Sequence, residues 1–165
     1  MTFSGDDIAE LEARMRPGAL SRAGFLGPSE NLRAVIAADD LAMKQAGQTF
    51  EAVAAALEVL IGAATASPDH EVTVSGRHHI RVRQYLGFQI CPWSPDPNHA
   101  QCSAGEAKGL PYSSLDWRLE NLRTGEALEG PGLIVHLMYD HHFCEGRGSP
   151  NRVDPIALVR VLELA

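Results

Sequence analysis

A short stretch near the end of the chain is rich in residues that bind metals or transfer protons. Within ten positions it holds five such side chains: His136, His141, His142, Cys144 and Glu145. Two further cysteines, Cys91 and Cys102, lie upstream. Zinc prefers four thiolate or imidazole ligands in a tetrahedron. A strand end and its following loop would supply two of them, and a helix the other two. We therefore predict a Zn²⁺ site with the ligands Cys91, Cys102, His136 and His141.

The spacing of the two histidines sets a condition on the helix that carries them. Four residues separate His136 from His141, a spacing that zinc fingers use at a helix end. In an ideal helix the two side chains point about 140° apart, so the helix must tighten or end near Asp140 for both to reach one ion. His142 and Cys144 are alternatives for the fourth ligand.

The distribution of histidine and cysteine along the chain supports the search for a metal site. All seven His and all three Cys lie between His70 and Cys144, and the first 69 residues contain neither. Three cysteines cannot all pair, and an exported disulfide framework normally uses an even number. The cysteines therefore favour metal binding over a disulfide scaffold.

Each residue also has an interpretation without a metal. His136 would then be a buried histidine hydrogen-bonded to a carboxylate or carbonyl, Cys91 an inert core thiol and Cys102 a loop thiol. The adjacent histidines His78 and His79 are expected on opposite faces of a strand rather than in a binding site.

Two catalytic alternatives remain open. With only three protein ligands, zinc would hold a water molecule, and Glu145 or Asp140 would act as the base of a metal-dependent or His-assisted hydrolase. The H-E-x-x-H pattern of zinc proteases does not occur. Cys144 near a histidine suggests a nucleophile, but the chain carries no cysteine-hydrolase signature. It also carries no phosphate-binding glycine loop.

Composition excludes several classes of protein. The 165 residues are 45% apolar and 21% charged, as in ordinary globular proteins, with a net charge of −7. Only two residues are Lys and no basic run exists, so we expect no nucleic-acid partner. No stretch of eighteen apolar residues occurs, so we expect no membrane span. The acidic start lacks the pattern of a secretory signal, which predicts a soluble cytoplasmic protein.

The first half predicts three helices. A helix capped by Ser4 extends through Met15, a second starts within Gly27–Glu30 and ends at Gly47, and Thr49 caps a third. The short link between the second and third predicts an antiparallel pair. We interpret Asp39 and Asp40 as solvated charges on the surface of the second helix.

The second half predicts a small antiparallel sheet. Strands over 71–75 and 80–90, with a turn at Gly76-Arg77 and a bulge at Gly87, lead to a long loop from Ser94 to Tyr112. Further strands follow around Leu115–Leu119 and after the turn at 123–126. The apolar segment 133–139 then predicts a buried helix, and Asp154-Pro155 opens a last one.

Parts of the chain resemble an uncharacterised bacterial protein family. The matching stretches are YLGFQICPW (85–93), Asp116-Trp117 with the turn at 121–125, PGLIVHLMYDHHFCEG (131–146) and 152–155, with a fainter match at 23–27. The resemblance implies no activity. Similar proteins tend to carry Phe where this chain has Cys144, and they need no Cys at position 102.

The sequence therefore predicts a single α+β domain over residues 1–165. In it an N-terminal helical hairpin (1–69) packs on a small antiparallel sheet, which a buried helix and a short C-terminal helix follow (70–165). The leading functional hypothesis is a structural zinc ion that joins strand, loop and helix. The alternatives are the hydrolase described above and a metal-free interaction or dimerisation module. A homodimer or protein partner is expected to bind through the N-terminal helices.

Overall fold

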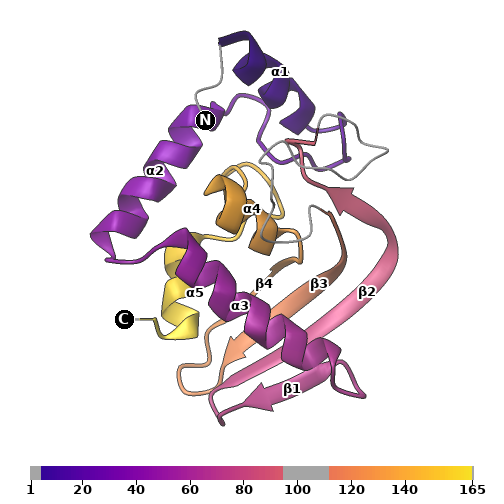
Figure 1. Ribbon diagram of the computed structural model, residues 1–165, viewed down its shortest axis with the longest axis vertical. Coiled ribbons are helices and arrows are strands. Elements are labelled where there is room, and N and C mark those ends of the chain that lie inside the picture. Colours follow the sequence, from indigo (N-terminus) through magenta and orange to yellow (C-terminus); the bar gives the residue numbers. More distant parts are fainter. Residues whose placement is uncertain (1–4, 95–111, 165) are drawn as a thin grey trace.

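The computed structural model describes residues 5–94 and 112–164 and has an α+β fold, as predicted (Figure 1). Helices come first in the chain, a sheet follows, and two helices end it. The helices are α1 (Gly5–Met15), α2 (Leu32–Gln45), α3 (Phe50–Thr65), α4 (Ile134–His141) and α5 (Pro155–Leu162). The strands are β1 (Glu71–Val74), β2 (His78–Ile90), β3 (Tyr112–Asn121) and β4 (Ala127–Pro131). Most of the predicted loop from Ser94 to Tyr112, with Cys102, lies outside the described residues.

The sheet is an antiparallel meander in which each strand pairs with the next one in the chain. The predicted turn after β1 is confirmed: the N–H of Arg77 donates to the carbonyl of Val74 at 3.0 Å, and Gly76 has a φ of +65°. The predicted bulge is also confirmed, since the register of β2 against β3 shifts between Gln84 and Gln89 around Gly87, whose φ is +94°. Positive φ favours glycine at both positions.

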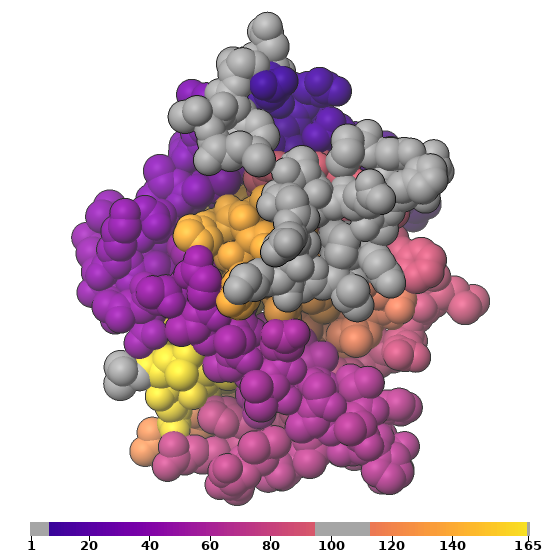
Figure 2. Space-filling view, in the orientation of Figure 1, coloured from indigo at the N-terminus to yellow at the C-terminus, as the bar shows by residue number. Residues whose placement is uncertain are grey.

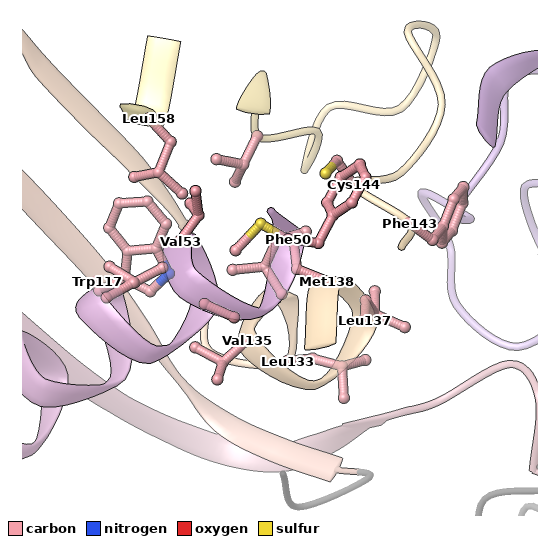
Figure 3. Packing of buried hydrophobic residues seen from close by; sticks show 14 of the residues in the cluster. Phe50, Val53, Trp117, Leu133, Val135, Leu137, Met138, Phe143, Cys144 and Leu158 are labelled. Atoms are coloured by element: carbon pink, nitrogen blue, oxygen red, sulfur yellow. The ribbon is translucent and has the colours of Figure 1, made fainter. Parts of the chain in front are cut away.

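The core lies between one face of the sheet and the helices α3, α4 and α5. Alternate residues of β2 and β3 face it, as the period of a half-buried strand requires. Helix α4 is buried from Ile134 to Met138, and all of these residues except His136 are apolar. Figure 3 shows side chains of α3, β3, α4 and α5 gathered in this core. Trp117 is 1% exposed, and its indole N–H donates to the carbonyl of Pro131 at 2.9 Å. This bond fixes the chain just before α4.

In the N-terminal half the structure confirms the predicted cap of α3 and corrects the predicted start of α2. Thr49 caps α3 as predicted, with its hydroxyl oxygen accepting from the N–H of Ala52 at 3.1 Å. The prediction that α2 starts within Gly27–Glu30 is wrong. The Glu30 carboxylate instead accepts from the N–H of Gly27 at 2.6 Å, which holds this segment in a turn, and Asn31 caps α2.

The predicted antiparallel pairing of α2 and α3 is also wrong. The two helices meet at 86°, because α2 packs against α5 while α3 packs against α4 and the sheet (Figure 1). Within the described ranges no single helix is long and apolar enough to cross a membrane. Helices α2 and α3 reach that length and composition only when taken together, across their bend.

Asp39 is not the solvated surface charge that the sequence predicted. It is 4% exposed, and both of its carboxylate oxygens accept from the guanidinium of Arg152, at 2.8 and 2.9 Å. The same guanidinium donates to the carbonyl of Glu145 at 2.8 Å. Asp40 does lie at the surface, where it pairs with Lys44 at 2.7 Å. The Asp39–Arg152 pair therefore fixes the segment after α4 against α2.

We expect Asp39→Ala to lower the free energy of unfolding by about 3–5 kcal/mol, because it leaves a guanidinium buried without its partner. Asp40→Ala is the matched control on the neighbouring residue. It removes only a surface pair and should cost less than about 1 kcal/mol. Urea unfolding followed by tryptophan fluorescence measures both changes. Equal losses in the two variants would contradict the importance of the buried pair.

Candidate metal centre

Three of the four predicted zinc ligands lie together in the structure. The ligand atoms of Cys91, His136 and His141 all lie within 4.8 Å of one another. Across residues 5–94 and 112–164 this is the one group of three or more His, Cys, Asp or Glu side chains close enough to hold a metal ion. Cys102, the fourth predicted ligand, lies outside those residues. The fold therefore brings three of the four predicted side chains together.

The sheet positions Cys91 and the start of α4. Cys91 directly follows β2 and is fully buried, and its carbonyl accepts from the N–H of Ser94 at 2.9 Å. Gly132, between β4 and α4, donates its N–H to the carbonyl of Leu115 at 2.8 Å. A Cβ at Gly132 would overlap the side chains of Ser113 and Leu115, so any other residue here would force these side chains on β3 to shift.

The end of α4 brings His141 to Cys91. His141 is the last residue of the helix, and His142 follows in the left-handed conformation with a φ of +51°. The predicted helix end near Asp140 is thus confirmed. Nε2 of His141 lies 3.4 Å from Sγ of Cys91, and the rings of His136 and His141 meet edge to face at 5.1 Å.

Trp93 covers His141 and was missed in the sequence. Its ring stacks on the imidazole with 3.9 Å between centroids and an angle of 8°, and it meets Phe143 edge to face at 5.5 Å. Trp93 is 5% exposed, so it shields this side of the cluster from water. An aromatic residue two positions after a candidate ligand was the only signal in the sequence.

His136 has unsatisfied hydrogen-bonding capacity. It is 1% exposed, and among the described residues neither ring nitrogen has an aligned hydrogen-bond partner. Nδ1 lies 2.7 Å from Oδ2 of Asp140, close enough for an ion pair but with an unfavourable angle. A buried polar group without a partner costs about 1–3 kcal/mol. A metal ion on Nε2 would remove that cost, so the residues fit a metal.

The alternative fourth ligands do not join the cluster. Nε2 of His142 lies 2.6 Å from the Glu51 carboxylate, and the ring stacks on Phe50. Cys144 is buried, and burial together with the nearby Asp39 carboxylate raises the pKa of its thiol well above the usual value. A thiol that stays protonated is a poor nucleophile, which also argues against Cys144 in covalent catalysis.

Glu145, one of the two bases predicted for a hydrolase, lies outside the cluster. Its side chain is fully buried, and one carboxyl oxygen accepts from the hydroxyl of Ser149 at 2.9 Å. The other oxygen has no partner among the described residues. Burial raises the pKa of Glu145 to about 8, although the Ser149 bond acts to lower it. The carboxyl group is therefore mostly protonated at pH 7 and is poorly suited to remove a proton from zinc-bound water.

His78 and His79 lie where the sequence placed them, on opposite faces of β2. Nε2 of His78 lies 2.9 Å from the carbonyl of Val161 on α5. His79 lies 3.6 Å from the Glu71 carboxylate on β1. Neither belongs to the metal cluster, and their contacts are with α5 and the neighbouring strand.

Comparison with known proteins gave no match to a family model, to a curated protein or to a solved structure. The resemblance noted for YLGFQICPW and for residues 131–146 therefore stays a prediction. The interpretation of the cluster depends on its own geometry.

The pKa of Glu145 predicts a pH dependence of stability. The folded protein keeps a proton on this carboxyl up to about pH 8, whereas the unfolded chain loses it near the ordinary value of 4.5. Between these two values the folded state binds more protons, so stability falls as the pH rises, by about 1.4 kcal/mol per pH unit. Glu145→Gln removes this contribution and keeps an oxygen that accepts from Ser149.

We therefore expect Glu145→Gln to become more stable relative to the unsubstituted protein by about 2–3 kcal/mol as the pH rises from about 5.5 to 7.5. Urea unfolding of both proteins at matched pH values measures the difference. A difference that stays constant across this range would show that the buried carboxyl does not titrate as inferred.

Proposed function

We propose that the protein binds one zinc ion through Cys91, His136 and His141, and that the ion joins the end of β2 to α4. The observation that carries this proposal is the meeting of one thiol and two imidazoles within 4.8 Å, with His136 buried and lacking an aligned partner among the described residues. One thiolate with two imidazoles is a donor set that zinc accepts readily.

The spacing of the donor atoms supports a tetrahedral ion. With zinc bonds of about 2.3 Å to sulfur and 2.0–2.1 Å to nitrogen, tetrahedral donors lie about 3.3–3.6 Å apart. Cys91 Sγ and His141 Nε2 are already 3.4 Å apart. Small side-chain movements would therefore bring all three donors to one ion.

Burial favours a structural role over hydrolysis. Cys91 and His136 are at most 1% exposed, and Trp93 covers His141. A hydrolase needs an open coordination position beside a base. Glu145 is unsuited as that base because it is bound to Ser149 outside the cluster, and Asp140, the other candidate base, lies against Nδ1 of His136. Structural sites instead take a fourth protein ligand. Cys102, eleven residues after Cys91, is the fourth ligand that we propose from the sequence.

Metal content tests the ligand set. Protein purified without a histidine tag should contain about one equivalent of zinc by inductively coupled plasma mass spectrometry, and Cys91→Ser and His141→Asn should lose most of it. The matched controls are Cys144→Ser, the other buried free cysteine, and His142→Asn, the neighbouring histidine. Both should keep the metal. Asn suits position 142 because it tolerates positive φ.

Two results would contradict the proposal: protein without metal after zinc loading, or equal metal loss in the ligand variants and their controls. Cys102→Ser is measured in the same series. Weakened zinc binding in this variant would support a fourth thiolate, whereas unchanged binding would remove Cys102 from the ligand set.

Metal removal tests the structural role. Because the ion would bind the folded state and not the unfolded chain, zinc at a thousand times its dissociation constant should add about 4 kcal/mol to the free energy of unfolding. A chelator should therefore lower the melting temperature and change the near-ultraviolet circular dichroism of Trp93, and added zinc should restore both. A chelated protein that has lost its zinc but melts at the same temperature would contradict a structural ion.

A further inference from the structure

Asp140 contacts the non-ligating side of His136. The two residues lie four positions apart on α4, and Oδ2 of Asp140 lies 2.7 Å from Nδ1 of His136. Their side chains are 8% and 1% exposed, so the contact is shielded from water. We propose that Asp140 is the positioning residue that keeps the proton of His136 on Nδ1 and leaves Nε2 free to bind the metal. This inference rests on the proposed metal site.

The chemistry of a neutral imidazole makes this contact decisive. One ring nitrogen carries the proton and the other carries the lone pair, so a metal can bind only the unprotonated one. The partner of the other nitrogen selects the tautomer. A carboxylate can only accept a hydrogen bond, so Asp140 stabilises the Nδ1–H form. Its negative charge also makes Nε2 a stronger donor to a cation.

The surroundings of His136 support orientation by Asp140. Asp140 is not a member of the cluster of three ligand atoms, so its role differs from that of a direct ligand. Among the described residues no other side chain or backbone group forms an aligned hydrogen bond with either nitrogen of His136. Asp140 is therefore the group close enough to select its tautomer. A small rotation of the ring or of the carboxylate would align the 2.7 Å contact.

The tautomer can be measured without a metal. Two-bond ¹⁵N–¹H correlation spectra of the metal-free, ¹⁵N-labelled protein identify the protonated nitrogen of His136, which His136→Gln assigns. We expect Nδ1–H in the unsubstituted protein. Asp140→Ala should shift the proton toward Nε2, the tautomer that a free imidazole side chain prefers. A metal-free protein with Nε2–H on His136 in the presence of Asp140 would overturn the inference.

Zinc affinity gives the second readout. Competition with a chromophoric chelator should show about 10- to 100-fold weaker binding in Asp140→Ala and Asp140→Asn, the usual effect of losing the partner of a ligating histidine. Asp140→Glu, which keeps a carboxylate, should recover part of the affinity. Asp40→Asn, a surface carboxylate on α2, is the control and should leave the affinity unchanged. Unchanged affinity in all three Asp140 variants would overturn the positioning role.

The two readouts separate this inference from the proposed function. If the unsubstituted protein takes up no zinc, the proposed function fails and the tautomer measurement alone decides the role of Asp140. If zinc binds but the Asp140 variants keep full affinity and the Nδ1–H tautomer, the metal site stands and the inference fails. Asp140→Asn has nearly the shape of the original residue, which keeps the test valid if the alanine variant unfolds.

Discussion

The burial of α4 is the constraint on which the rest of the structure depends. This helix is the link between the sheet and the C-terminal segment, and it packs against α3 in the core. In Figure 2 the orange surface around α4 is bordered by the purple surfaces of α2 and α3. Burying a helix brings its polar side chains out of water, and each of them then needs a partner. His136 is the residue at which this requirement is greatest.

The chain meets this requirement in three different ways around the end of α4. On one side, His136 and His141 face Cys91, and their donors converge as a metal site requires. On the other side, the segment after the helix carries Arg152, whose charge the Asp39 carboxylate neutralises. Glu145 represents a third outcome, because a buried carboxyl without a cation keeps its proton. The two buried cysteines also differ in their surroundings: Cys91 lies beside the imidazole of His141, whereas Cys144 lies near the Asp39–Arg152 pair.

Local features of the sequence predicted most of the fold. Thr49 acts through a side-chain hydrogen bond to a nearby residue, and Gly76 and Gly87 act through backbone conformation. All three had the predicted effect. The angle between α2 and α3 depends on what each helix packs against later in the chain, which the short link between them does not specify. The burial of Asp39 was predicted wrongly for the same reason. Its partner Arg152 lies 113 residues away, and helical periodicity does not indicate such a distant pair.

The candidate site was predictable where residue type and spacing constrain geometry. Two histidines five positions apart reach one ion only where a helix ends, and α4 ends at His141. The role of Glu145 was not predictable, because a residue close to two histidines in the sequence need not lie close to them in space. The left-handed residue His142 ends the helix before Glu145. Glu145 bonds to Ser149 and does not join the two histidines.

The separation of the ligands along the chain bears on what an ion at this site would stabilise. Cys91 and His136 are 45 residues apart in the chain, so an unfolded chain brings them together only at a cost in loop entropy. The pairing of β2 with β3 and the close approach at Gly132 hold the two segments together and so offset that cost. An ion that needs all three donors would then favour the assembled sheet and helix over every partly unfolded state. Its binding energy would thus strengthen the contact between β2 and α4, where the chain buries a histidine without an aligned partner among the described residues.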